Sequence, residues 1–204
     1  MLNPKSYAAA RINLSRLATF LLLCALCVTR SRWTGDSALT GELLALTGWL
    51  LVGVGVLGRV WSGSYICGRK NNQLMMVGPY SLCRNPLYLF SFIGGLGAML
   101  ITQTLLFPLI FVILYLAYYQ PVMRSEEQTL QHIHGADFEK FRNDVPLFWP
   151  RSLSFKESDQ YPISARHFRR FLLEVFWFIA FAALLQLMHY LHGVDILPGW
   201  YHVY

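Results

Sequence analysis

The residues that first suggest chemistry are an arginine and a proline at the start of an apolar run, in the stretch VGPYSLCRNPLYLF from Val77 to Phe90. Asn85 suits the N-cap of a helix and Pro86 suits its first turn, so we expect a helix to begin here. The free amides of that turn favour a negative group, and Arg84 adds a full positive charge. The pattern predicts an anion site; the alternative is a membrane-edge loop in which Arg84 reaches a lipid phosphate.

A second candidate is a pair of adjacent carboxylates, Glu126 and Glu127, close behind Arg124. Two acids at the inner end of an apolar segment are costly unless cationic partners stand near them. Arg84, Arg124 or a bound cation could supply that charge. The alternative is a solvated first turn of a helix, where acidic residues favour the positive end of the helix dipole.

The elements that must position these groups are membrane helices. The chain has 204 residues, of which 55% are hydrophobic and only 14% charged, with a mean hydropathy of +0.40. A bilayer core needs about 20 helical residues. Candidate spans are the four segments Leu39–Leu57, Leu87–Ile101, Leu105–Val122 and Phe168–Leu191, with a weaker fifth at Leu17–Val28.

The N-terminal segment could instead be a signal peptide, because Lys5, Arg11 and Arg16 precede its apolar run. It shows no small-x-small cleavage site, and Arg30 and Arg32 follow at once, so we favour an uncleaved helix.

The distribution of positive charge predicts the orientation. With five spans and a cytoplasmic N-terminus, fifteen of the 17 lysines and arginines lie on the cytoplasmic side, and only Arg30 and Arg32 lie outside. The formal charge of +6 is then explained by orientation and by anionic lipid headgroups, and no nucleic-acid partner is needed. We therefore expect an integral protein of a bacterial inner membrane.

The two candidate sites should meet in space. Only Thr102–Thr104 separates the spans Leu87–Ile101 and Leu105–Val122, so these spans form an antiparallel hairpin. Its far ends then bring Arg84 close to Glu126 and Glu127.

The longest polar region, Met123–His167, begins as a helix. Leu130, Ile133, Phe138 and Phe141 recur at helical spacing, with Gly135 interrupting. The segment VPLFWP, Val145–Pro150, cannot continue the helix because each proline lacks an amide donor, and its Phe148 and Trp149 suit a membrane interface.

At these residues the chain resembles the isoprenylcysteine carboxyl methyltransferase family, in its bacterial-type membrane form. GPYSLCRNPLY looks like the family signature G-P-Y-x-x-x-R-H/N-P-x-Y. EEQTLQHIHGADFEKFRNDVPLFWP looks like the later block, which starts E-E-x-x-L and ends in a proline. One helical hairpin fills the spacing between them, and the resemblance covers residues 71–150 of a single 204-residue domain.

The resemblance implies an integral membrane enzyme that uses S-adenosylmethionine at its cytoplasmic face, with a lateral opening for a lipophilic acceptor. Carried over by position, the cofactor-binding residues are Asn72, Leu74, Val77, Gly78, Pro79, Tyr80, Arg84, Asn85, Pro86, Tyr88 and Glu126. The catalytic candidates are Glu127, Glu126 and Arg124, with Glu127 as the group that positions or deprotonates the acceptor.

The chain departs from the family pattern at several positions. Asn72 stands where a histidine is common, and LMMVGPY replaces L-V-T-x-G-P-Y. Phe138 and Phe141 replace two tyrosines, and Trp149 replaces an aliphatic residue. These changes bear on the identity of the acceptor more than on that of the cofactor.

Other groups favour structural readings. The glycines Gly53, Gly55, Gly58, Gly94, Gly95 and Gly97 are expected to pack helices closely. His132 and His134 do not share a helix face and have no cysteine beside them, so no metal site is expected, and His189 and His192 are placed at the outer interface. Glu174 either pairs with Arg170 or lines a substrate cavity.

We therefore predict an all-α integral membrane protein of about five spans with a cytoplasmic helical cofactor-binding region, acting as a methyltransferase on a lipophilic acceptor. Two alternatives stay open. One is a non-catalytic transporter or scaffold of the same fold. The other is a reductase of the sterol-reductase type, which would use a nicotinamide cofactor.

Overall fold

The structure, a computed structural model, describes residues 20–33, 37–67, 74–157 and 160–204. Its helices are α2 (Ala38–Ile66), α3 (Pro79–Leu82), α4 (Pro86–Ile101), α5 (Leu106–Asp144) and α6 (Ala165–Gly193). Residues 20–28 are also helical, and the short strands are β1 (Thr29–Ser31) and β2 (Tyr201–Val203). The four segments predicted as strong spans all lie in helices, α2, α4, α5 and α6.

Within the described residues, three helices are long and apolar enough to cross a membrane, namely α2, α5 and α6. The fourth, α4, is apolar but shorter, with 16 residues. The weaker span, Leu17–Val28, begins outside the described residues, and its described part is helical.

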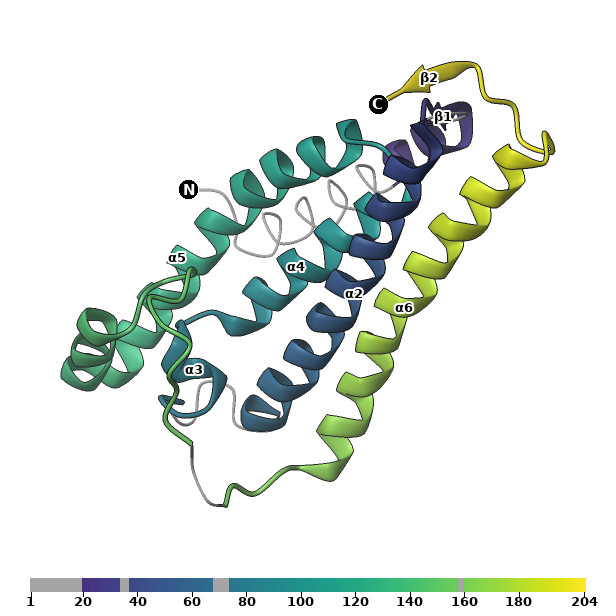
Figure 1. Cartoon of the computed structure of the whole chain (residues 1–204). Helices are drawn as coiled ribbons and strands as arrows, with labels where there is room; N and C mark the ends of the chain where they lie inside the picture. Colours follow the sequence, from purple (N-terminus) through teal and green to yellow (C-terminus); the bar gives the residue numbers. More distant parts are fainter. Residues whose placement is uncertain (1–19, 34–36, 68–73, 158–159) are drawn as a thin grey trace.

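The long helices run side by side, with α4 between α2 and α5 and with α6 on the other side of α2 (Figure 1). Glycines bring α2 and α4 together: a Cβ on Gly55 would lie 2.5 Å from the Cα of Gly94, and one on Gly48 would lie 2.6 Å from the carbonyl oxygen of Gly97. This confirms the packing role predicted for Gly55, Gly94 and Gly97. The prediction was wrong for Gly53, which has open space beside it.

The interior of the bundle is apolar. Val52, Ala98, Ile101, Ala182 and Leu185 form one buried cluster, and exposed leucines and isoleucines cover the outer faces of α2, α5 and α6. Large exposed apolar faces on long helices suit lipid and not water.

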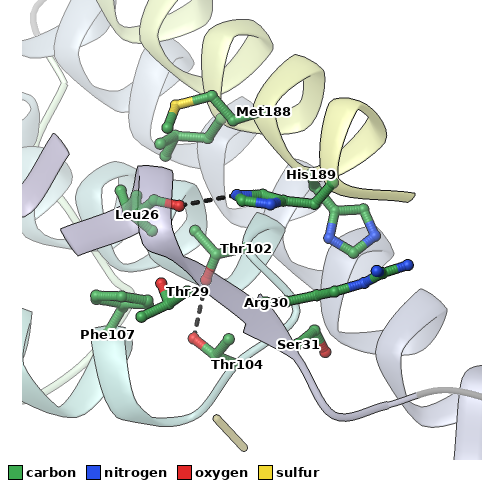
Figure 2. A pocket seen from close by; sticks show the side chains of 11 residues that line it. Leu26, Thr29, Arg30, Ser31, Thr102, Thr104, Phe107, Met188 and His189 are labelled. Carbon is green, nitrogen blue, oxygen red and sulfur yellow. Dashed lines mark hydrogen bonds between the residues drawn. The ribbon is translucent and has the colours of Figure 1, made fainter. Parts of the chain in front are cut away.

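At one end of the bundle, β1 pairs in parallel with β2, with Thr29 opposite Tyr201 and Ser31 opposite Val203. A small cavity of about 20 Å³ lies beside these strands. Figure 2 shows Arg30 and His189 at its wall and a hydrogen bond between Thr102 and Thr104. His192 lies at this end of α6, where it is buried, and its Nε2 donates to the carbonyl oxygen of Leu26.

At the opposite end lie α3, the last turns of α5 and residues 145–157 (Figure 1). Gly135 interrupts α5 with φ 53° and ψ −122°, a conformation that glycine adopts far more readily than other residues. The helix then ends at Asp144, and Val145 is extended. The predicted interruption at Gly135 and the predicted end of the helix before Val145–Pro150 are therefore both confirmed. Phe148, however, is buried, while Trp149 is exposed.

Candidate active site

A large cavity lies at the α3 end of the bundle. It measures about 750 Å³, within the range of roughly 300–1,000 Å³ that is typical of small-molecule sites. Its walls come from α2, α3, α4, α5 and α6. The predicted site residues that line it are Leu74, Tyr80, Arg84, Asn85, Pro86, Tyr88, Glu126 and Glu127.

The cavity wall contains an ion pair between Arg84 and Glu127. Arg84 Nε donates to Glu127 Oε1 at 2.6 Å, and the two side chains are only 9% and 16% exposed. The prediction that the two ends of the helical hairpin meet is therefore confirmed. An ion pair with so little water around it is strong only where further hydrogen bonds satisfy both partners.

Arg84 has those further bonds. Its Nη1 donates to the carbonyl oxygens of Arg142 and Val145, at 2.6 Å each. A helix end leaves carbonyl oxygens unpaired, and an arginine at this position satisfies them. Nη2 is the one guanidinium nitrogen with no hydrogen bond to a described residue. The sequence suggested that the whole guanidinium of Arg84 could bind a ligand. In the structure Nε and Nη1 are already used, so only Nη2 can do so.

Asn85 stands at the N-cap position of α4, as predicted, but its side chain does not cap the helix. Its Nδ2 instead donates to the carbonyl oxygen of Leu147 at 3.1 Å. The backbone N–H of Arg84 donates to the carbonyl oxygen of Pro146 at 2.9 Å. The two sequence blocks are therefore joined directly, the first at Arg84 and Asn85 and the second at Glu127 and 142–147.

Gly78 begins α3 with φ 60°, and a Cβ there would lie 2.4 Å from the ring of Tyr65. Its N–H donates to the carbonyl oxygen of Lys156 at 2.6 Å, and the N–H of Lys156 bonds the Ser81 hydroxyl at 2.9 Å. Gly78 and Pro79 are buried behind the cavity wall and set the position of the next residue, Tyr80.

Tyr80 is the clearest unsatisfied group at the site. The side chain lines the cavity and is buried, and its hydroxyl has no hydrogen-bond partner among the described residues. Burial raises the pKa of Tyr80 well above its usual value, so the hydroxyl stays protonated. A buried hydroxyl without a partner costs free energy, and a bound polar molecule would supply the missing bond.

Not every predicted residue reaches the cavity. Val77, like Gly78 and Pro79, does not line it. Arg124 is exposed and also outside the lining, so Arg84 and not Arg124 is the cation beside Glu127. Asn72 lies outside the described residues.

The apolar part of the cavity wall is aromatic. Phe138 and Phe141, which lie beyond the interruption at Gly135, are both buried and meet edge to face with ring centroids 6.3 Å apart. Both rings line the cavity, so the two positions where phenylalanine replaces a tyrosine of the family pattern are in the cavity wall.

Several polar residues that line the cavity were not among the predicted site residues. Arg59 and Ser91 lie on α2 and α4, and Tyr119 lies on α5. The available signal was Arg59, a single arginine within an apolar helix, where a charge is costly unless it has a role. Glu174 lines the cavity and forms no ion pair with Arg170 among the described residues, so of its two predicted roles the structure favours the second.

Across the part of the chain that the structure describes, no group of three or more His, Cys, Asp or Glu side chains is placed to hold a metal ion. The polar groups at the cavity are instead one ion pair, one orphaned hydroxyl and scattered charges. The long apolar helices are those of an integral membrane protein, and a cavity of small-molecule size lies at one end of them.

Comparison with known proteins is consistent with this class. Residues 39–137 match the family model described as phospholipid methyltransferase. The chain is 30% identical over 187 residues to the cobalt-zinc-cadmium resistance protein CzcN of Cupriavidus metallidurans, covering 92% of this chain and 85% of that protein. It is 32% identical over 190 residues to the nickel-cobalt-cadmium resistance protein NccN of Alcaligenes xylosoxydans xylosoxydans, covering 92% and 87%. No solved structure matches significantly.

The chain therefore belongs to the phospholipid methyltransferase family, within the isoprenylcysteine carboxyl methyltransferase-like membrane methyltransferases. The family match covers both the first sequence block and the two glutamates, and it confirms the resemblance on which the site residues were chosen.

Proposed function

We propose that this protein is an enzyme that transfers the methyl group of S-adenosylmethionine to a lipophilic acceptor at the cytoplasmic face of the membrane. The observation that carries the proposal is the cavity of about 750 Å³, which the Arg84–Glu127 pair and the orphaned Tyr80 hydroxyl both line. Family membership supports the reaction class.

The residues present fit such a cofactor. The Tyr80 hydroxyl and Nη2 of Arg84 are donors suited to its carboxylate, and Glu126 and Glu127 are acceptors suited to its amino group or ribose hydroxyls. When bound, the cofactor supplies a methyl carbon already activated by its sulfonium.

The protein's own contribution is alignment and exclusion of water. Phe138 and Phe141 give the cavity a dry wall, and Arg84 holds one oxygen of Glu127. The other oxygen, Oε2, is the group we propose to position the acceptor or to take its proton. Arg124, which we also considered, is exposed and is left out of this role.

We further propose five spans, with helix 20–28 and its preceding residues as the first and α2, α4, α5 and α6 as the others. The N-terminus and the cavity then face the cytoplasm of a bacterial cell, because the lysines and arginines concentrate on that side.

Ligand binding to purified protein in neutral detergent tests the proposal. Calorimetry should show binding of S-adenosylmethionine and none of a nicotinamide dinucleotide. Binding of the dinucleotide alone would favour the reductase, and binding of neither would favour a non-catalytic transporter or scaffold. Lipid profiling with a labelled methyl donor would then identify the acceptor.

A second candidate function is suggested by the relatives, both of which are named as metal resistance proteins. In this alternative the chain contributes to metal resistance without methyl transfer. A strain lacking the protein would be challenged with cobalt and cadmium and complemented with Glu127→Gln. Restored growth would favour the non-catalytic role, whereas failure of a variant that is normally expressed would favour methyl transfer.

A further inference from the structure

Arg59 is a second charged residue at the cavity, and it takes no part in the Arg84–Glu127 ion pair. It lies in α2, one of the helices long and apolar enough to cross a membrane, and it lines the cavity. Its Nη1 donates to the hydroxyl of Ser91, but its Nε is buried and has no hydrogen-bond partner. No ion pair joins it to a described acid. A charged group in a membrane helix that no acid meets in an ion pair is costly and points to a function, even with the Glu174 carboxylate in the same cavity.

Two aromatic rings of α6 hold this guanidinium. The Cζ atom of Arg59 lies 5.5 Å from the ring centroid of Phe171 and 5.0 Å from that of Phe178. Phe171 packs closely on α2, since a Cβ on Gly63 would lie 2.1 Å from its ring. Cation–π contacts stabilise an arginine without neutralising it. The positive charge of Arg59 is therefore held in place and left available to an anion.

The depth of Arg59 suits the polar group of a lipophilic molecule. Its partner Ser91 lies five residues into α4 from Pro86, about 7.5 Å along the helix axis at 1.5 Å per residue. The Arg84–Glu127 pair stands at the start of the same helix. Polar groups thus line the cavity at two levels along α4, the family motif near its start and Arg59 with Ser91 further along. Tyr88 and Tyr119 are also in the wall.

We propose that Arg59 binds an anionic group, a phosphate or a carboxylate, of the lipophilic acceptor and so positions its reactive atom toward Glu127. This proposal rests on the proposed methyl transfer only where it says that the bound molecule is the methyl acceptor. Anion binding itself depends on the geometry of Arg59. Glu174 also lines the cavity, and its carboxylate disfavours an anion there without forming an ion pair with Arg59.

Anion binding is measured by native mass spectrometry of the protein in a neutral maltoside detergent, with decyl phosphate and decanoate as probes and decyl maltoside as the neutral control. The protein should bind at least one of the two anions, and Arg59→Gln should weaken that binding about tenfold or more, the effect of about 1.4 kcal/mol. Arg59→Lys, which keeps the charge, should retain part of it. A preference for decyl phosphate would indicate a phosphate-bearing acceptor, and a preference for decanoate a carboxylate.

Arg166→Gln is the matched control, because Arg166 is exposed and does not line the cavity. It should leave anion binding unchanged. Equal anion binding by Arg59→Gln and the unaltered protein would overturn the proposal. S-adenosylmethionine binding is measured on the same samples: its absence from the unaltered protein would overturn the proposed function and leave the anion result standing.

Glu174→Gln separates the anion site from a purely structural Arg59–Glu174 pair. If Arg59 is an anion-binding residue, removal of the Glu174 charge should keep or strengthen decyl phosphate binding and should leave the melting temperature unchanged. If the two side chains form a structural pair, Glu174→Gln should lower the melting temperature as much as Arg59→Gln does, and that result would overturn the proposal.

Discussion

Arg84 connects parts of the chain that are far apart in the sequence. One guanidinium group bonds Glu127 in the middle of α5 and two carbonyl oxygens at its end. In a site with little water, removing one partner of such a pair leaves an uncompensated charge and costs more than the pair itself contributes. Variants of Arg84 will therefore lose fold and binding together, so the chemistry of the site is better tested at Glu127 and Tyr80.

Glu127→Gln tests the proposed role in the reaction. The amide oxygen can still accept from Arg84 Nε, so the fold and most of the S-adenosylmethionine affinity should remain. An amide cannot take a proton near neutral pH, so methyl transfer at saturating cofactor should fall about 100-fold or more. Glu139→Gln, an exposed position in α5, is the control. Near-normal turnover by Glu127→Gln would return the residue to a binding or structural role.

Tyr80→Phe should give effects of opposite sign on the free and the bound protein. Without ligand, removing a buried hydroxyl that has no partner should leave the melting temperature equal or slightly higher. If that hydroxyl bonds the cofactor, affinity should fall by about 0.5–1.5 kcal/mol, or roughly 2- to 12-fold in calorimetry.

Tyr65→Phe is the matched control for Tyr80. Its hydroxyl is also buried and unpaired among the described residues, but Tyr65 does not line the cavity. It should leave cofactor affinity unchanged. Unchanged affinity in Tyr80→Phe as well would remove the Tyr80 hydroxyl from the site.

The residue types and their spacing were enough to predict that Arg84 and the two glutamates meet, because a short loop forces the far ends of a hairpin together. They could not predict which donors of Arg84 are already used. That depends on the carbonyl oxygens of Arg142 and Val145, which accept from Arg84 and lie beyond the break in α5 at Gly135. The involvement of Arg59 was missed because its ring partners lie on α6, more than 100 residues away in the sequence.

At the scale of elements, the close approach of α2 and α4 brings two polar lining residues of the cavity together. Arg59 lies on α2 and its hydrogen-bond partner Ser91 lies on α4. The glycines at their contact have no side chains to separate the backbones. In a membrane, where lipid tails are as apolar as leucine, such close packing is a main source of helix association.

Gly55→Ala and Gly53→Ala make a matched pair on α2. At Gly55 the new methyl group would overlap backbone atoms of Gly94, which cannot move aside, so we expect a loss of about 1–3 kcal/mol. At Gly53 nothing lies within 4 Å, so the change should be neutral or slightly stabilising. Heating in detergent followed by size-exclusion chromatography measures both. Equal stability of the two variants would mean that the α2–α4 contact is looser than described.

The helices were predictable because long apolar runs carry a strong signal, whereas β1 and β2 were not. Each strand has three residues, and they pair across most of the chain, from Thr29 to Tyr201. No local pattern encodes a contact of that range. The ends of α2 and α5 also reach beyond the predicted spans, because helix continues past the apolar run.

Taken as a whole, the molecule has two unlike ends. The helix α3 and residues 145–157 lie at one end, and the β1–β2 pair lies at the other (Figure 1). The cavity is at the α3 end, since Tyr80 and Arg84 line it. Arg30 and Arg32, the two basic residues expected outside, lie in or beside β1, and Arg30 pairs with Asp195 at 2.8 Å. The positive-inside rule therefore predicts that the cavity end is cytoplasmic.

Cysteine labelling tests this orientation. Ser154→Cys and His202→Cys place thiols at exposed positions at the two ends, in a protein whose Cys24 and Cys27 are replaced by alanine. Burial raises the pKa of Cys67 and raises that of Cys83 to about 12, so these thiols stay protonated near neutral pH and react slowly. A membrane-impermeant maleimide should label His202→Cys on intact spheroplasts and Ser154→Cys only after permeabilisation. The parent without an added cysteine gives the background. Labelling of Ser154→Cys on intact spheroplasts would reverse the orientation, and the cavity would then face away from the cytoplasmic supply of S-adenosylmethionine.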